Sequence, residues 1–416
     1  MPSDLLACPE CDLLHRLRPL AKGERAHCVR CGTFLRRGPS PFHGRALPLY
    51  LVALVLFLLA NASPLLRLHL HGTVQEATLA GCARIMADQG WPWIAALLIV
   101  TVIVAPLVHL GGVAWVLLRL QAGWRTKGMA VAFRLIAQFR AWEMAEVFAL
   151  GILISFVKLS KTSTVLPGPS LASLLLFVVA AAAAASALDA DRVWDALGEA
   201  PSPEVPEGAL TAKAAGLAAC PTCRRLSAVR EHRFCPRCAT SLHLRKPRSR
   251  GRTWALVLAA GLLWIPANAL PVMTIVQLGR AKSDTILSGI LYFIREGSWG
   301  LALVIFTASV LVPLVKLAAL VLLLASERGR WTWSHTQRAW IYRVTEAIGR
   351  WSMVDIFVVA LMVAMVELGS VASVAPGPGA MAFAMMVVAT MLAVNVFDPR
   401  LLWDTLEPPP PEPTHG

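Results

Sequence analysis

The chain repeats one plan twice, and this duplication limits its possible folds more than any other feature. Each half begins with two Cys-x-x-Cys pairs and continues with four long apolar segments. Asn61-Ala-Ser-Pro64 recurs as Asn268-Ala-Leu-Pro271, at an offset of 207 residues. Farther along, Trp194-Asp195 recurs as Trp403-Asp404, at an offset of 209 residues. Self-similarity over most of a chain indicates a duplicated structural unit, so we expect two copies of one fold.

Composition places most of this chain in a membrane. Hydrophobic residues fill 56% of the 416 positions and charged residues 15%, whereas soluble domains carry roughly 25% charged residues. A helix needs about 20 apolar residues to cross a bilayer. Such stretches lie at 46–66, 92–118, 142–160, 170–188, 253–274, 299–325, 352–370 and 379–397. We predict an all-α polytopic membrane protein with two parallel repeats of four transmembrane helices, because four spans return each copy to the same side.

The positive charge of the chain lies beside the predicted spans. The net charge is +14, and arginines precede the first and fifth apolar stretches. Cytoplasmic flanks of membrane helices are enriched in arginine and lysine, so we expect both termini and the 189–252 linker in the cytoplasm. Contact with anionic lipid headgroups accounts for these charges, and we expect no nucleic-acid partner. The first 40 residues lack the apolar core of a cleavable signal peptide.

Eight of the nine cysteines form two clusters with the spacing of zinc ribbons. The two Cys-x-x-Cys pairs of a cluster are separated by 16 residues in the first half and 11 in the second. Each pair can supply two thiolates to one tetrahedral ion. Four protein ligands close such a site, so we expect structural Zn²⁺, two ions per chain, with iron as the alternative. The predicted ligands are Cys8, Cys11, Cys28, Cys31, Cys220, Cys223, Cys235 and Cys238.

These features predict six segments, each half consisting of a small cytoplasmic zinc ribbon followed by a transmembrane domain. The ribbons occupy 1–40 and 216–245, and the transmembrane domains 41–190 and 246–406. A linker at 191–215 and a disordered tail at 407–416 are rich in proline and glutamate, a composition typical of linkers.

Polar side chains inside the second set of spans are candidates for function, because an intramembrane charge costs roughly 2.5–3.5 kcal/mol on insertion scales. Lys316 lies in the sixth span, and Ser309 lies two helical turns earlier on the same face. Asp355 in the seventh span and Thr390 in the eighth can converge with them as a lysine–carboxylate pair with hydroxyl support. Such a group can relay protons or respond to a membrane potential. Hydrogen bonding between helices is the alternative role.

The first half carries different residues at the corresponding places. His109 replaces Lys316, and Glu146 replaces Asp355. Lys158 corresponds to Glu367, near the outer ends of spans three and seven, where both can also snorkel to the interface. We therefore expect any transport site in the second half, with the first copy mainly a scaffold.

Asparagine and proline mark fixed places in both halves. Asn61 and Asn268 stand three residues before a proline at the ends of spans one and five. We interpret both motifs as helix terminations in which the asparagine satisfies local backbone groups, in preference to ligand sites. Pro106 and Pro313 lie within spans two and six and should kink them, which opens room for a cavity between helices.

This set of motifs resembles the paraquat-inducible protein A family. The resemblance rests on the doubled four-cysteine modules, the Asn-x-x-Pro endings, Pro313-Leu-Val-Lys-Leu317, Phe397-Asp398-Pro399-Arg400 and Trp403-Asp404. It implies a multi-pass protein of the bacterial inner membrane with cytoplasmic termini. The partner implied is a periplasmic MCE-domain protein that forms a hexameric tunnel. The cargo implied is phospholipid passing between the inner membrane and that tunnel.

The sequence leaves several functions open. No Gly-x-x-x-x-Gly-Lys-[Ser/Thr] motif occurs, so we expect no ATP hydrolysis in this chain and no enzyme activity. Our leading hypothesis is lipid transport. Its energy comes from a proton gradient acting on the second-half polar cluster, from a separate ATPase, or from no source at all. The alternatives are a proton-coupled exporter of small toxic compounds, a non-transporting scaffold for a periplasmic partner, and a membrane redox protein.

Overall fold

The computed structural model describes residues 5–38, 43–70, 73–126, 128–159, 164–198, 203, 205–206, 208–229, 231–277, 280–326, 333–349, 353–365 and 372–404. This part of the chain is mostly helical. Four of its helical runs are long and apolar enough to cross a membrane: Pro92–Gln121, Pro169–Ala187, Ala302–Ser326 and Pro378–Val396. A helix also lies in each of the other apolar stretches that the sequence predicts to be spans.

The two halves contain the same order of helices. In the first half these are α1 (Ala46–Ala62), α2 (Leu79–Asp88), α3 (Pro92–Leu98), the π-helix η2 (Ile99–Val104), α4 (Ala105–Gln121), α5 (Met129–Phe139), α6 (Ala145–Leu159), α7 (Pro169–Ala187) and α8 (Ala190–Leu197). In the second half they are α9 (Ser249–Ala269), α10 (Ile286–Arg295), α11 (Trp299–Phe306), the π-helix η4 (Thr307–Leu311), α12 (Val312–Ser326), α13 (His335–Ile348), α14 (Val354–Met365), α15 (Pro378–Val396) and the 3₁₀ turn η6 (Pro399–Leu402).

The all-α prediction is wrong in one respect, because each half also contains a three-stranded antiparallel sheet. The strands are β5 (Leu66–Leu70), β6 (Thr73–Ala77) and β7 (Thr164–Pro167), then β10 (Met273–Gln277), β11 (Arg280–Asp284) and β12 (Ala372–Pro376). In each sheet, two strands follow the first helix of the half (α1 or α9), and the third strand precedes α7 or α15. Pairing in this way satisfies backbone groups that a helix would otherwise satisfy.

The Pro-Gly-Pro sequence at the start of α7 and α15 has a steric reason. Gly168 and Gly377 lie against the carbonyl oxygens of Pro64 and Pro271, respectively, and an added Cβ would collide with them. Their own N–H groups donate to Leu65 and Val272. Only glycine permits this close approach of two backbone segments.

The prolines inside the long helices coincide with π-helical turns. Pro106 and Pro313 are each the second residue of a helix that follows directly on η2 or η4. A proline lacks the N–H that would continue the α-helical ladder, and its ring collides with the preceding turn. A wider π-turn accommodates both effects, so a π-helical turn lies next to each proline that is predicted to kink its span.

The interpretation of the Asn-x-x-Pro motifs as helix terminations is confirmed. Asn61 Nδ2 donates to the Phe57 carbonyl at 2.8 Å, and Asn268 Nδ2 donates to the Trp264 carbonyl at 2.9 Å. Both bonds lie in the last turn of their helix. Each asparagine side chain thus adds a hydrogen bond to a backbone carbonyl one turn earlier in its own helix.

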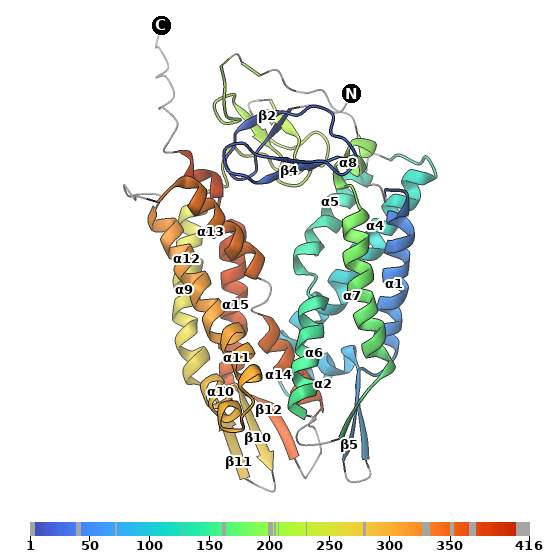
Figure 1. Ribbon diagram of the computed structural model, residues 1–416, viewed down its shortest axis with the longest axis vertical. Helices are drawn as coiled ribbons and strands as arrows, with labels where there is room; N and C mark the ends of the chain where they lie inside the picture. Colours follow the sequence, from blue (N-terminus) through green and yellow to red (C-terminus); the bar gives the residue numbers. More distant parts are fainter. Residues whose placement is uncertain are drawn as a thin grey trace.

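The two halves lie side by side, with the cysteine-containing segments across one end and the small sheets at the other (Figure 1). They meet chiefly where α6 packs against α14, with the Phe148 and Phe357 rings edge to face at 5.5 Å. Gly151 makes this contact close, since a Cβ there would approach the Phe357 Cβ to 3.1 Å. Helix α14 also packs against α2 of the first half. The halves therefore form one packed unit at the sheet end.

Candidate functional site

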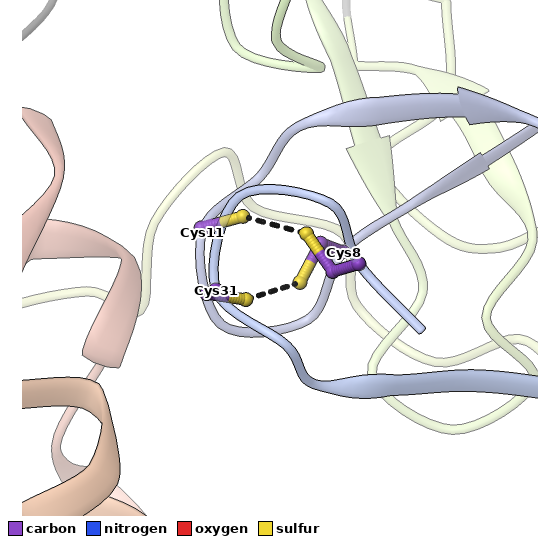
Figure 2. A group of neighbouring side chains, drawn as sticks. Cys8, Cys11 and Cys31 are labelled. Carbon is purple, nitrogen blue, oxygen red and sulfur yellow. Dashed lines mark hydrogen bonds between the residues drawn. The ribbon is translucent and has the colours of Figure 1, made fainter. Parts of the chain in front are cut away.

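The first cysteine cluster is preformed for a tetrahedral ion. The Cys8 and Cys31 Sγ atoms are 3.5 Å apart, and those of Cys11 and Cys28 are 3.4 Å apart. Figure 2 shows the labelled sulfur atoms turned toward a common centre. Four thiolates at about 2.3 Å from one Zn²⁺ require sulfur separations of about 3.8 Å. All four side chains are buried, so the donor set fits a closed metal site.

The second cluster repeats this geometry. The Cys220 and Cys238 Sγ atoms are 3.5 Å apart, and those of Cys223 and Cys235 are 3.6 Å apart. The ligand atoms of each cluster all lie within 4.8 Å of one another. Both clusters could therefore hold metal ions, in agreement with the prediction of two sites. A disulfide would need sulfur atoms at about 2.05 Å.

Short turns position the thiols by the same backbone arrangement each time. The residue after the second cysteine of each pair has a positive φ: Asp12 at 64°, Gly32 at 74°, Arg224 at 55° and Ala239 at 55°. Its N–H donates to the carbonyl of the first cysteine. This left-handed residue turns the chain back so that both sulfur atoms face one point.

Small strands frame the two clusters. The pairs β1 (Leu5–Ala7) with β2 (Leu14–Arg16) and β3 (Arg25–His27) with β4 (Phe34–Arg37) belong to the first, and β8 (Leu217–Ala219) with β9 (Leu226–Ala228) belongs to the second. We name the described residues of 5–38 the first cysteine module and those of 216–245 the second cysteine module.

The metal-binding turns of each module dock on the opposite half of the chain. In the first module Glu10 lies 2.9 Å from Arg343 of α13, and the Arg30 guanidinium lies over the Trp403 ring at 4.6 Å. The four cysteines of this module belong to the buried cluster that contains Phe397 and Leu402. The metal-binding turns of the first module therefore pack on the second helical half, whereas Arg36 of β4 pairs with Asp191 and Asp195 of α8 in the first half.

The second module packs on the first helical half in the same crossed manner. Arg134 of α5 donates to the Ala239 carbonyl at 2.8 Å, and Arg237 lies 3.3 Å from Asp195 of α8. Its cysteines share a buried cluster with Phe133 and other first-half residues. Emptying either metal site would thus act on the helices of the other half.

A buried charge network ties the modules to the end of the last helix. Arg245 lies 2.9 Å from Asp12 and 2.7 Å from Asp404. Arg400 binds Asp398 at 2.9 Å and approaches Asp12 at 3.7 Å. Burial raises the pKa of Asp12 despite Arg245 and Arg400. For Asp398 and Asp404 burial acts in the same direction, but hydrogen bonds from Arg400 and Arg245 outweigh it and hold each pKa below its usual value.

Two residues of the predicted polar cluster meet inside the second half. Lys316 is 1% exposed, and its Nζ donates to the Thr390 hydroxyl at 2.9 Å and to the Gly349 carbonyl at 3.3 Å. The Thr390 hydroxyl in turn donates a hydrogen bond to the Val387 carbonyl at 2.8 Å. The lysine thus has only neutral acceptors among these bonds.

Ser309 lies elsewhere in the same helical run. Its hydroxyl donates to the Ile305 carbonyl at 2.7 Å within η4, and it lines an apolar cavity of about 60 Å³ together with Phe293 and Ile356. No hydrogen bond joins Ser309 to Lys316 in the described part of the chain. The predicted shared face assumed a uniform α-helix, whereas η4 changes the helical register between them.

The remaining predicted residues fall partly outside what the structure describes. The side chains of Asp355 and Lys158 and the whole of Glu367 lie outside the described residues. Glu146 is described, and it is exposed in the first turn of α6.

Glu143, which the sequence argument missed, partners His109 instead. Its carboxylate lies 2.9 Å from His109 Nδ1, and His109 is 6% exposed. The alignment of the halves directs attention to Glu146 because that residue matches Asp355. The available signal for Glu143 was an acid at the start of the third apolar stretch, beside the conspicuous Trp142.

Comparisons with known proteins agree with the duplicated sequence. The family model "Paraquat-inducible protein A" matches residues 44–198 and 251–407. "Intermembrane transport protein PqiA" of Escherichia coli K12 is 34% identical over 402 residues, 96% of this chain and 95% of that protein. "Lipophilic envelope-spanning tunnel protein A" of the same strain is 29% identical over 404 residues, covering 97% and 92%.

A third relative lies in another organism. "Probable intermembrane transport protein" of Haemophilus influenzae is 27% identical over 410 residues, covering 97% of this chain and 96% of that protein. No solved structure matches the chain. The full-length matches and the apolar helices indicate an integral membrane protein. This chain belongs to the paraquat-inducible protein A family.

Proposed function

We propose that this protein is the inner-membrane subunit of a phospholipid transport system that passes lipid to or from a periplasmic MCE-domain tunnel. The names of its relatives, which refer to intermembrane transport and to a lipophilic envelope-spanning tunnel, support a membrane transport role. Phospholipid as cargo and the MCE-domain partner are the specific parts of this proposal. The role is that of a transporter, not an enzyme.

The proposed architecture has eight membrane spans in two parallel repeats. The helices in each apolar stretch and the twofold match of the family model support it. Both termini and the two cysteine modules lie in the cytoplasm, as the basic flanks favour. The predicted domain boundaries at 40, 190, 215, 245 and 406 remain part of this proposal.

Zn²⁺ occupies both cysteine clusters in the proposed protein. Cys8, Cys11, Cys28 and Cys31 would hold one ion, and their counterparts in the second module would hold the other. Such an ion would fix the fold of each module. The chain's own residues then transmit that order, because the metal-binding turns contact α13 and η6 or α5 and α8.

The observation that carries the transport proposal is the buried ammonium of Lys316. An intramembrane lysine is expensive unless it has a partner or a role, and here the contacts of its Nζ are a hydroxyl and a backbone carbonyl. A lysine held by neutral acceptors can release its proton without breaking an ion pair. We propose that Lys316 takes up and releases a proton during transport, with Asp355 as its proton partner and Ser309, Glu367, Glu146 and Lys158 as further polar groups of the route.

Purification in mild detergent without added lipid tests the proposal. We expect mass spectrometry to detect a tunnel-forming partner and phospholipid with the wild-type protein. The combined replacement of Lys316 and Asp355 by alanine should retain the partner but abolish lipid traffic in cells. Recovery of neither partner nor lipid would contradict transport. Full lipid traffic in the double variant would leave the protein a scaffold.

A further inference from the structure

A polar cavity of about 400 Å³ lies where both cysteine modules meet the first helical half. The first module contributes Arg37 to its wall, and the second contributes Arg224. Helix α4 contributes His109, and the turn after α5 contributes Arg140. The volume is within the range of small-ligand sites. Because its wall comes from three parts of the chain, the cavity exists only in the assembled molecule.

Each carboxylate in the cavity wall pairs with an arginine outside the wall, and Arg224 of the wall also attracts Asp191 electrostatically. Asp191 lies 3.6 Å from Arg36, and Asp189 lies 3.3 Å from Arg192. Neither of these arginines lines the cavity. The wall therefore presents an excess of guanidinium groups.

Two of these guanidinium groups have no acidic partner among the described residues. The Nε of Arg37 is buried and has no hydrogen-bond acceptor, and no carboxylate of the described chain forms an ion pair with Arg140. The third, Arg224, donates to the Leu35 carbonyl at 3.0 Å, which leaves its charge uncompensated by an acid in direct contact. Arg140 and Arg224 are exposed, so the buried Nε of Arg37, a donor without an acceptor, is the group that most favours an anion in the cavity.

In the corresponding region of the second half, an arginine neutralises the equivalent carboxylate. Asp398, which corresponds to Asp189, is bound by Arg400 at 2.9 Å through two nitrogen–oxygen contacts. Arg400 is replaced by Asp191 in the first half, and Gly349 is replaced there by Arg140. In the second half, Asp398 is thus paired with an arginine of its own turn. At the first half, arginines without an acidic partner among the described residues line the cavity.

We propose that this cavity is a binding site for an anionic phosphate group, held by Arg37 and Arg140 with Arg224 at its rim. A guanidinium binds phosphate through paired N–H···O bonds. Phosphate offers oxygens in several directions, which suits arginines contributed by three separate segments better than a planar carboxylate does. The phosphate can belong to a phospholipid headgroup or be free inorganic phosphate.

Equilibrium binding to the full-length, metal-loaded protein in detergent tests the site. The probes are inorganic phosphate, a short-chain phosphatidylglycerol, and the diacylglycerol with the same acyl chains but no phosphate. The test variant is Arg37→Gln with Arg140→Gln. The matched control is Arg125→Gln, which removes an exposed arginine from the connection between α4 and α5. Metal content and melting temperature establish that each variant is folded, and Arg140→Lys provides a milder change if the double variant is not.

We expect the double variant to weaken binding at least about tenfold, and the control less than about twofold, since charge-assisted bonds are the stronger kind. Arginine-dependent binding of inorganic phosphate would support the site and identify free phosphate as its ligand. Arginine-dependent binding of phosphatidylglycerol alone would support it and identify a lipid headgroup. Binding of diacylglycerol as strongly as phosphatidylglycerol would overturn it, as would wild-type affinity in the double variant or binding of no probe.

This site is separate from Lys316, the residue at the centre of the proposed proton route, which lies in the other half. Lys316→Met should therefore bind the probes with wild-type affinity even where transport fails. Loss of probe binding in Lys316→Met would contradict a separate site and would count against the assignment to Arg37 and Arg140.

Discussion

The ammonium group of Lys316 lies 2.9 Å from the Thr390 hydroxyl, and both side chains are 1% exposed. The bond joins α12 to α15, the second and fourth long helices of their half. Thr390 in turn donates to its own helix. The result is a directed chain of hydrogen bonds from a buried cation to a backbone carbonyl, which gives the lysine a fixed position without a direct counter-charge in that chain.

This arrangement predicts opposite effects of replacing its two members. Lys316→Met removes a buried charge and keeps the volume, so we expect the free energy of unfolding to stay within about 1 kcal/mol of wild type or to rise. Thr390→Val leaves the ammonium without its nearer acceptor and should cost about 1–3 kcal/mol. Melting of the purified protein in detergent measures both. Equal destabilisation by the two changes would show that the lysine serves as a structural bond.

The buried network around Arg245 predicts a large effect at the junction of the modules. Arg245→Ala leaves Asp12, whose side chain is 3% exposed, without its closest cation, and we expect a loss of about 3 kcal/mol. The exposed pair of Arg18 with Glu24 at 2.6 Å provides the control. Arg18→Ala should cost less than about 1 kcal/mol, as surface pairs do. A similar small loss for Arg245→Ala would mean that the network does not hold the modules.

Crossed docking predicts that metal loss acts across the molecule. We expect about two zinc ions per chain by elemental analysis, and one after Cys11→Ser. That variant should increase amide hydrogen exchange in α13 and η6 of the second half, because the first module packs there. Cys223→Ser should instead increase exchange in α5 and α8. If each variant loosened only the half that follows it in sequence, the docking would be wrong.

The lowered pKa of Asp404 predicts one component of the pH dependence of stability. A carboxylate with a folded pKa below its unfolded value contributes stability that is complete above the unfolded pKa and is lost as the pH falls through the folded one. The ordinary pKa of this group is 3.8. The stability difference between wild type and Asp404→Asn should therefore be constant from pH 8 to about 5 and shrink below about pH 4. A difference that widens on acidification would contradict this sign.

The close contact between the halves predicts that Gly151 tolerates no large side chain. Gly151→Leu would meet Phe357 across the α6–α14 interface and should cost about 1–3 kcal/mol through overpacking. Gly261→Leu is the control, since no atom lies within 4 Å of a Cβ built there. Comparable melting temperatures for the two variants would show that the halves do not pack as described.

The sequence predicts most of the local structure because local signals determine it. The four-cysteine spacing requires converging thiols. The side chains of Asn61 and Asn268 each bond to a carbonyl only four residues away. The three-stranded sheets were missed because strands of four or five residues, such as β7 and β12, give little periodicity. Glu143 was missed because pairing with His109 depends on where α6 begins.

Long-range packing is what the sequence does not reveal. Nothing in Arg343 or Arg134 indicates that each binds the cysteine module of the opposite repeat. The cavity beside Arg37 and Arg140 likewise depends on long-range packing, because both modules meet the first helical half there. That the first half serves mainly as a scaffold stays a prediction.

Lipid movement by the purified protein in liposomes tests directly whether Lys316 couples a proton gradient to lipid transport. The protein, its tunnel partner and a fluorescent phospholipid are reconstituted, and transfer to acceptor vesicles is followed with and without an imposed pH gradient. The account predicts that the gradient accelerates transfer by wild type and that Lys316→Met abolishes this acceleration while remaining folded. Transfer by Lys316→Met at the wild-type rate under the gradient would contradict it.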